Sequence, residues 1–269
     1  MNIKLLVLDL DDTLLTTDKR INPIDRETLK RCESRGIMIS SASGRFYGSQ
    51  RVILKELELG NSETIHIGDG GGTIFTQKRL LQAQGFFNDR QYRSLINKIR
   101  ENNLSVAVTT PNGVFFEDPA LYAFYPEINN DNIQMAHCIS DLSARTDPMR
   151  VIFKYFSEEE KQIFMSLSDD SLSCYHAGRN IMEIAPMHLN KLGGIKALSD
   201  IIGVPLENIA AIGDSDNDLS MIEGVGLGMA VANASASIKN AATYISNSDN
   251  DHGGVAELIE KYILQMSKR

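Results

Sequence analysis

An apolar segment that runs directly into clustered carboxylates, LLVLDLDDTLL at residues 5–15, constrains the fold more than any other feature. Residues 3–8 are apolar with a single exception, which is typical of a strand buried on both faces of a parallel sheet. The chain then places Asp9, Asp11 and Asp12 at the end of this strand. Clustered carboxylates resist burial unless a cation or hydrogen bonds compensate them. The segment therefore predicts either a solvated acidic turn or a site for a positive group.

A regular alternation of strands and helices continues from this strand. Helical spacing over 23–35 ends at a glycine, and the strands 37–41 and 64–67 are predicted with a helix between them. The same alternation returns after residue 192, with the strands 209–212 and 225–229 and a helix on either side of the first. Strand–helix–strand units connect by right-handed crossovers, so the pattern predicts an α/β fold with a doubly wound parallel sheet.

The pattern between these two parts is different. Two helices are predicted there, at 89–101 and 158–167, and the other elements are strands, with a loose polar stretch between 117 and 150. The predicted strands are 106–109, 114–117, 150–155, 172–176 and 180–184. Consecutive strands with few crossovers are typical of an α+β module. We therefore predict a Rossmann-like core of residues 1–82 and 187–269, interrupted by an inserted α+β cap domain at 83–186.

Composition limits the functions open to the chain. Lys and Arg total 27 against 35 Asp and Glu, a net charge of -8 without a basic block, which argues against a nucleic-acid partner. The 3 widely spaced cysteines form no CxxC pair, so neither a disulfide framework nor a zinc site is expected. No apolar run approaches ~18 residues and no leader pattern opens the chain. We expect a cytoplasmic protein without a membrane partner, either a monomer or a small homo-oligomer.

A second acidic cluster, IGDSDND at 212–218, follows another apolar strand. Ligands of an open α/β sheet bind beyond the carboxyl ends of its strands, so both clusters should meet at one edge. Asp214 and Asp218 would then lie near Asp9 and Asp11, where acidic oxygens can share one hard cation. Taken alone, the first cluster is compatible with an Asx-type turn and the second with a helix cap. Their co-occurrence favours a metal, because each raises the electrostatic cost of the other.

Two further positions are suited to phosphoryl oxygens. Ser43, in SASGR, follows the second predicted strand, where a hydroxyl and neighbouring backbone N–H groups can hold a phosphoryl group. Taken alone, a strand-to-helix N-cap explains this serine better. Lys191 precedes a predicted helix and could neutralise charge on a transferring phosphoryl group, although an isolated lysine there normally faces solvent. The presence of the two acidic clusters favours the phosphate-binding interpretation of both residues.

In this order, the four motifs resemble the haloacid dehalogenase (HAD) superfamily of phosphohydrolases: DLDDT at 9–13, Ser43, Lys191 and GDSDND at 213–218. The long insert between the second and third motifs and MAVANAS at 229–235 resemble the Cof-type branch with its type-II cap. One departure is clear. The loop after the third strand reads GDGGGT where the family normally carries Asn-Gly-Ala, so contacts of that asparagine cannot be transferred.

The resemblance implies a Mg²⁺-dependent phosphatase acting on a small phosphorylated metabolite, such as a sugar phosphate or a phosphorylated cofactor. Asp9 would attack phosphorus and form an aspartyl-phosphate, and Asp11 would serve as general acid and base. The metal would be bound by Asp9, the main-chain carbonyl of Asp11 and Asp214, with Asp218 binding directly or through water. The residues expected to bind the substrate are Ser43, Gly44, Arg45, Lys191 and Asn217.

The cap residues and the exact reaction leave alternatives open. His176, Arg179 and Glu183 lie on or beside a predicted strand pair that could face the site, or they are ordinary exposed hairpin residues. A phosphosugar mutase or a non-catalytic phosphometabolite-binding protein could use the same fold. A receiver-type phospho-acceptor would need no long insert. Analysis of the products separates these alternatives.

Overall fold

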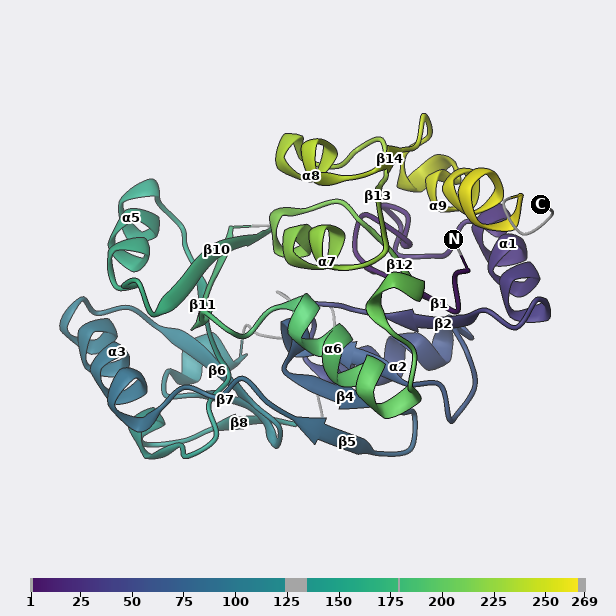
Figure 1. The fold of residues 1–269 in the computed structure, drawn as a ribbon. Helices are drawn as coiled ribbons and strands as arrows, with labels where there is room; N and C mark the ends of the chain where they lie inside the picture. The colour runs from purple at the N-terminus through teal and green to yellow at the C-terminus, as the bar shows by residue number, and fades with distance from the viewer. Residues whose placement is uncertain (1, 124–134, 179, 266–269) are drawn as a thin grey trace.

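The computed structural model of the chain describes residues 2–123, 135–178 and 180–265. The molecule has two lobes, and the lobe that holds both termini is built on a parallel sheet with the strand order β14-β13-β12-β1-β2 (Figure 1). Its strands are β1 (Leu5–Leu8), β2 (Met38–Ser41), β12 (Ile209–Gly213), β13 (Leu227–Ala230) and β14 (Tyr244–Ile245). Every residue of β1 is buried, as its apolar sequence predicts for a central strand.

Helices cover both faces of this parallel sheet. Alternate residues of β1 point to opposite faces: Leu6 and Leu8 belong to one apolar cluster, and Leu5 and Val7 to another. The helices of the first face are α1 (Pro23–Ser34), α2 (Tyr47–Glu56) and α9 (Gly254–Ile259). Those of the second face are α6 (Lys191–Ile202), α7 (Leu219–Gly224) and α8 (Ala236–Ala241). The prediction of a doubly wound α/β core is therefore confirmed.

The predicted third strand does not continue the parallel sheet as an ordinary member. β3 (His66–Gly68) touches the end of β2 through one parallel bridge, and it pairs antiparallel with β4 (Thr73–Phe75), which pairs with β5 (Leu80–Ala83). The cause is the glycine cluster after β3, where Asp69, Gly70 and Gly71 all have positive φ. Such a run reverses the chain within a few residues. A hairpin therefore follows β3, where the predicted alternation of strands and helices ends.

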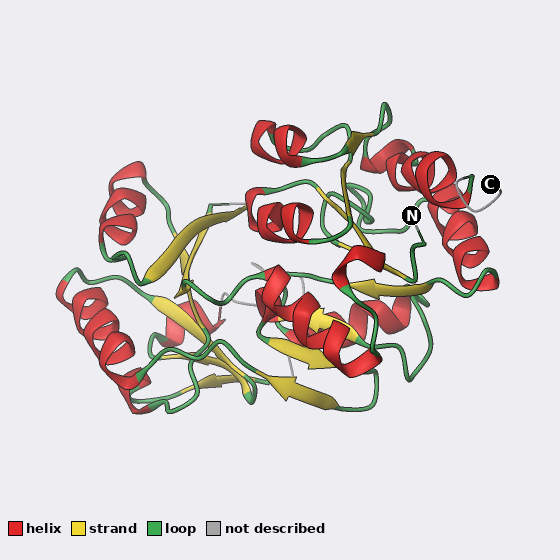
Figure 2. Ribbon diagram, in the orientation of Figure 1, coloured by secondary structure: helices red, strands yellow, loops and turns green. Residues whose placement is uncertain are grey.

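The second lobe is a six-stranded sheet with the order β10-β11-β9-β6-β7-β8. Its strands are β6 (Val106–Thr110), β7 (Gly113–Phe116), β8 (Ala136–Cys138), β9 (Arg150–Lys154), β10 (Leu172–Gly178) and β11 (Ile181–Pro186). The helices α3 (Asp89–Glu101) and α5 (Glu158–Ser166) pack on one face of this sheet, on the side away from the core (Figure 2). We refer to this lobe as the cap. The inserted α+β module is confirmed, while the boundaries at 82/83 and 186/187 stay predictions.

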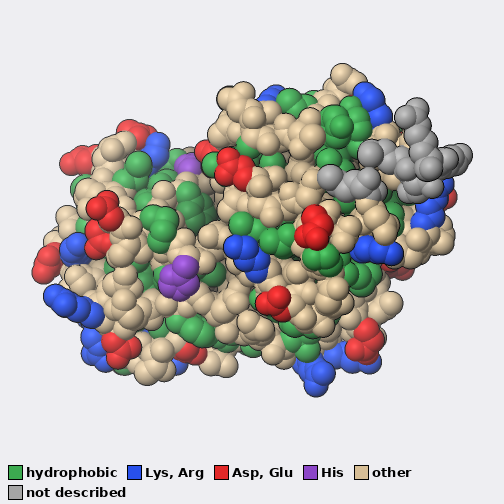
Figure 3. All heavy atoms as spheres, viewed as in Figure 1, with side chains coloured by type: hydrophobic (Ala, Val, Ile, Leu, Met, Phe, Trp, Pro, Cys, Tyr) green, Lys and Arg blue, Asp and Glu red, His purple; other side chains and the backbone are tan. Residues whose placement is uncertain are grey.

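Charged side chains are distributed without a dominant sign on the face shown in Figure 3, where acidic and basic groups alternate over both lobes. That pattern agrees with the absence of a basic block in the sequence. Within the described residues, no helix combines the length and the apolar character needed to cross a bilayer.

A buried carboxyl group at the start of α1 leads to a pH-dependent prediction for stability. Asp25 is 0% exposed; its Oδ1 accepts a hydrogen bond from the Ala256 N–H at 2.6 Å, and Oδ2 has no hydrogen-bond partner among the residues that the structure describes. Burial raises the pKa of Asp25 to about 6. Between pH 4 and 6 the unfolded chain therefore releases this proton while the folded protein retains it, so the contribution of Asp25 to stability falls as pH rises. Asp25→Asn does not ionise, and its stability relative to the wild type should rise by roughly 2 kcal/mol from pH 4 to pH 7 in urea titrations. A pH-independent difference would contradict this.

Candidate active site

Three carboxylates meet at the carboxyl ends of two neighbouring parallel strands. Asp9 follows β1 and Asp214 follows β12, and these strands run in register from Leu5 opposite Ile209 onward. Asp218 closes the short 3₁₀ turn after Asp214. Asp9, Asp214 and Asp218 each offer an oxygen atom, and these atoms lie within 4.8 Å of one another. The structure thus brings together the acidic residues that the two motifs predicted.

Burial makes this cluster electrostatically costly. It raises the pKa of Asp9 well above the usual value, and Asp218 and Asp214 add to the effect while Lys191 opposes it. Burial likewise raises the pKa of Asp214 to about 6, with Asp218 adding to the shift and the Thr13 hydroxyl opposing it. Both shifts mean that the positive charge nearby offsets only part of the cost of ionising these buried carboxylates. The donor set, carboxylate oxygens only, is the kind that Mg²⁺ prefers.

Lys191 lies beneath the cluster and pairs with two of its members. Its side chain is 1% exposed, and Nζ lies 2.5 Å from the Asp9 Oδ1 and also contacts the Asp218 Oδ1. Burial alone would lower the pKa of the lysine, but Asp218 and Asp9 outweigh it and raise that pKa. The lysine therefore stays charged. The prediction that it neutralises charge in the site agrees with this position, and the alternative of a solvent-facing lysine is wrong.

Asp218 is engaged by the protein through both of its oxygens. Oδ1 contacts Lys191, and Oδ2 accepts hydrogen bonds from the backbone N–H groups of Asp214 and Ser215, at 3.0 and 3.1 Å. With the Ser215 side chain it forms a capping box, so the helix-cap interpretation of this motif also holds. These contacts favour a role in which Asp218 fixes the loop and the lysine.

Asp11 points to a different set of partners. Its carboxylate accepts two hydrogen bonds from Arg45, at 2.7 Å from Nε and 2.9 Å from Nη2, and lies 2.9 Å from the Lys19 Nζ. Burial would raise the pKa of Asp11, but the two cations outweigh it and hold that pKa well below its usual range. Asp11 is therefore ionised in this structure. Lys19 had no signal in the sequence analysis.

The loop after β2 contributes the predicted phosphate-binding residues. Ser43 is 2% exposed, and its hydroxyl oxygen accepts a hydrogen bond from the Arg45 N–H at 3.1 Å. α2 begins at Tyr47 with Phe46 as its N-cap residue, so the alternative that Ser43 caps this helix is wrong. A Cβ atom added to Gly44 would lie 3.8 Å from the Asn217 side chain, which places the two motifs side by side.

A single pocket of about 360 Å³ connects these groups with the cap. The predicted residues that line it are Asp9, Asp11, Ser43, Gly44, Arg45, His176, Glu183, Asp214 and Asn217. Lys191 and Asp218 are buried behind Asp9 and do not line it. Of the predicted cap residues, Glu183 faces the site, so the alternative of an ordinary hairpin position is wrong for it. His176 borders the pocket, but it is exposed and its ring lies 3.0 Å from the Tyr155 hydroxyl, which agrees with the hairpin alternative. Arg179 lies outside the described residues.

A buried arginine between the lobes was missed by the sequence analysis. Arg150, at the start of β9, is 1% exposed, and its guanidinium pairs with Asp69 of the core at 3.0 Å and Glu183 of the cap at 2.9 Å. It also donates to the Gly44 carbonyl oxygen. The sequence gives no signal for this arginine, because charged residues at strand ends are common. Asp69 lies in the GDGGGT loop, which the sequence analysis noted only because it lacks the family's asparagine.

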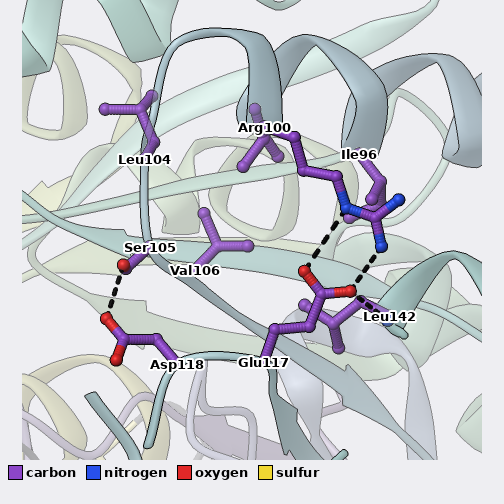
Figure 4. Close-up of a pocket in the computed structure, with 9 residues that line it drawn as sticks. Ile96, Arg100, Leu104, Ser105, Val106, Glu117, Asp118 and Leu142 are labelled. Carbon is purple, nitrogen blue, oxygen red and sulfur yellow. Dashed lines mark hydrogen bonds and ion pairs between the residues drawn. The ribbon is translucent and has the colours of Figure 1, made fainter. Parts of the chain in front are cut away.

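A second cavity, of about 250 Å³, lies within the cap between α3 and the strands β6 and β7. There Glu117 pairs with Arg100 and accepts from the Leu142 N–H, while the Ser105 hydroxyl donates to Asp118 at 2.6 Å (Figure 4). The polar groups of this cavity thus form hydrogen bonds and an ion pair with one another. None of them belongs to the acidic cluster.

A parallel α/β core that carries a buried carboxylate–lysine cluster at its strand ends, beneath an inserted α+β module, defines an enzyme with a capped active site. The sequence profile of the haloacid dehalogenase-like hydrolases matches residues 6–259. The chain therefore belongs to this family. The resemblance to this superfamily, drawn above from four motifs, and to its Cof-type branch, drawn from the insert and from residues 229–235, is confirmed, and so is the expectation of a phosphatase.

Individual relatives are similar to this protein over most of its length. It is 29% identical over 269 residues to the chloroplastic endoribonuclease YBEY of Arabidopsis thaliana, covering 94% of this chain but 45% of that protein. It is 24% identical over 266 residues to the 5-amino-6-(5-phospho-D-ribitylamino)uracil phosphatase YcsE of Bacillus subtilis, covering 98% and 97% of the two chains. A solved haloacid dehalogenase-like hydrolase from Bacteroides thetaiotaomicron shares 27% identity, with a TM-score of 0.79 over 97% of this chain and 99% of that one.

Proposed function

We propose that the chain is a Mg²⁺-dependent phosphatase that hydrolyses phosphate monoesters of small metabolites through an aspartyl-phosphate on Asp9. The position of Asp9 carries the proposal. Its carboxylate lines the pocket, is fixed by Lys191 from behind, and lies beside the loop of Ser43 and Gly44. A nucleophile, a buried cation and a loop suited to phosphoryl oxygens therefore converge on one point.

The proposed metal fits the residues around it. Asp9 and Asp214 would hold Mg²⁺ together with the main-chain carbonyl of Asp11, and Asp218 would act through its contacts with the loop and with Lys191. The raised pKa values of Asp9 and Asp214 support this, because a divalent cation would supply the positive charge that these carboxylates lack. When bound, Mg²⁺ would keep both groups ionised and withdraw charge from the phosphoryl group.

The chain's own residues supply the remaining chemistry. An oxygen of Asp9 attacks phosphorus, forming the Asp9–phosphorus bond while the bond from phosphorus to the leaving alcohol breaks. Asp11 gives a proton to that alcohol. In the second half-reaction Asp11 takes a proton from water, whose oxygen attacks phosphorus and releases Asp9 and inorganic phosphate. Ser43 and Arg45 stabilise the charge on the phosphoryl oxygens, together with Gly44 and Asn217 at the pocket wall, and Lys191 adds its positive charge from behind Asp9.

Because Asp11 is paired with Arg45, its ability to act as general acid depends on the bound substrate. An ionised Asp11 cannot donate a proton, and in this structure two cations hold it ionised. A phosphoryl dianion entering the pocket would compete for Arg45, which also lines it. Loss of that partner would raise the pKa of Asp11 and allow it to take up a proton. Substrate binding would thereby prepare the general acid.

Several observations support hydrolysis of a small phosphorylated substrate over the alternatives. Both Asp9 and Asp11 are present and line the pocket, which favours catalysis over non-catalytic binding. The bacterial relative named above is a phosphatase of a phosphorylated ribitylamino-uracil. We propose that residues 83–186 act as the cap that selects among such esters and excludes water from the site. A phosphosugar mutase is the second candidate from the sequence, and no contact in the structure favours it.

The test is a screen of phosphorylated metabolites with the purified chain and Mg²⁺, measuring released phosphate and analysing the organic product. The proposal expects free phosphate and the dephosphorylated alcohol in equal amounts. An isomerised ester without phosphate release would indicate a mutase. Binding without any turnover across the screen would indicate a phosphometabolite-binding protein.

Asp214→Ala tests the metal proposal. This change removes one oxygen ligand while Asp9 and Asp11 stay in place, so the Mg²⁺ concentration for half-maximal activity should rise by about 10-fold or more. Excess Mg²⁺ should restore part of the turnover. The measurement is a Mg²⁺ titration of phosphate release, with isothermal calorimetry of Mg²⁺ binding as a readout independent of activity. Unchanged Mg²⁺ affinity in both assays would remove Asp214 from the proposed site.

A further inference from the structure

The cap presents one row of side chains to the catalytic pocket. Tyr175, Glu183, Ile152 and Ala107 are consecutive cross-strand neighbours on β10, β11, β9 and β6, so they share one face of the cap sheet. The alternate residues on these strands form the apolar cluster with α3 and α5 on the other face. The row therefore faces the core. Ile152 and Glu183 line the pocket that also contains Asp9.

Glu183 is the anionic member of this row, and the protein fixes it through one oxygen. Oε2 accepts a hydrogen bond from the Arg150 Nη1 at 2.9 Å and another from the Tyr175 hydroxyl at 2.8 Å. Burial and the nearby carboxylate raise the pKa of Tyr175, so the phenol remains a donor. The residue is 6% exposed, and within the described part of the chain Oε1 has no hydrogen-bond partner. A held carboxylate with one available oxygen thus lines the pocket.

Arg150 sets the distance between this carboxylate and the phosphate-binding loop. The nitrogen that binds Glu183 also donates to the Gly44 carbonyl oxygen, while the other terminal nitrogen pairs with Asp69. Asp69 is in turn fixed, because its Oδ2 accepts from the Tyr47 N–H and the Thr73 hydroxyl. The aspartate of the unusual GDGGGT loop therefore anchors the arginine. Glu183 is held one guanidinium nitrogen away from the loop that would hold the phosphoryl group.

We propose that Glu183 selects the leaving alcohol, an inference that rests on the proposed phosphatase function. Its Oε1 accepts a hydrogen bond from a hydroxyl close to the ester carbon, and its charge rejects substrates that carry a second anionic group at that place. The preferred substrates are thus phosphate monoesters of neutral, hydroxyl-bearing alcohols. A site built to accept from a hydroxyl discriminates strongly against a group that cannot donate, and like charges brought together add to that discrimination.

Two three-carbon esters test this with the full chain and Mg²⁺. Glycerol 3-phosphate carries a hydroxymethyl group at the position where 3-phosphoglycerate carries a carboxylate. The wild type should show a kcat/KM for glycerol 3-phosphate at least about tenfold higher, and Glu183→Gln should reduce this ratio by about tenfold or more, since the amide removes the charge and can donate. If neither ester is hydrolysed, their inhibition constants against 4-nitrophenyl phosphate give the same ratio.

Glu117→Gln is the matched control, because Glu117 is also a paired glutamate of the cap but lines the second cavity (Figure 4). It should leave the ratio within about twofold of the wild-type value. Equal use of both esters by the wild type would overturn the inference, and so would an unchanged ratio in folded Glu183→Gln. If that variant does not fold, the inference is tested by the wild-type ratio of kcat/KM for the two esters alone. Failure to hydrolyse 4-nitrophenyl phosphate or any other ester would instead count against the proposed phosphatase.

Discussion

Asp9→Asn should abolish phosphate release, lowering kcat by at least about 10³-fold with every substrate that the wild type hydrolyses. The amide occupies the same space but cannot act as the nucleophile, so no aspartyl-phosphate can form. The fold should be retained, because the amide keeps the shape of the side chain and Lys191 stays paired with Asp218. Phosphate release under saturating Mg²⁺, together with a thermal unfolding curve, measures both effects.

Asp18→Asn is the matched control for this experiment. Asp18 lies in the same segment after β1 but is exposed and does not line the pocket. Its replacement should leave turnover within about twofold of the wild type. Substantial activity in a folded Asp9→Asn variant would refute the nucleophile assignment. Trapping of radiolabelled phosphate on the wild-type chain, and not on the variant, would support it independently of steady-state turnover.

The part of the site at the strand ends could be predicted from the sequence for a simple geometric reason. β1 and β12 are short, continuous apolar strands, and parallel neighbours in such a sheet end at the same edge. Polar residues that directly follow these strands, such as Asp9 and Asp214, must therefore converge. Their local sequence position fixes their place in space, and no information about distant contacts is needed.

The contacts between the lobes could not be predicted in this way. Arg150 reaches Asp69 across 81 sequence positions, and neither residue follows a strand that pairs with the other's. Their meeting depends on how the cap is placed over the core and on the reversal of the chain at the glycine cluster, which the alternation of strands and helices did not reveal. The ion pair between Asp11 and Arg45 was missed for a related reason, since side-chain direction within a loop is not set by a strand register.

Lys191→Met should destabilise the protein strongly as well as inactivate it. Methionine fills similar space but removes the cation that contacts both Asp9 and Asp218, which are 5% and 0% exposed. Breaking a buried ion pair by removing one partner costs about 3–5 kcal/mol, because the other charge stays buried. Without metal, the free energy of unfolding in urea should fall by that amount. Turnover should fall by at least about 10²-fold even in Mg²⁺, because a charge that neutralises the phosphoryl group is lost.

Added Mg²⁺ distinguishes the electrostatic explanation from a packing defect. A cation that binds the folded state and not the unfolded chain raises stability, and it would supply charge to the carboxylates that the lysine had neutralised. Mg²⁺ should therefore stabilise Lys191→Met more than the wild type. Lys196→Met, an exposed position on the same helix α6, should change stability by no more than about 0.5 kcal/mol and show the wild-type response to Mg²⁺. If Lys191→Met matched the wild type in metal-free stability, the lysine would not be what compensates the buried carboxylates. Equal Mg²⁺ stabilisation of both proteins would assign the loss to packing, since a methionine misfit would not depend on charge.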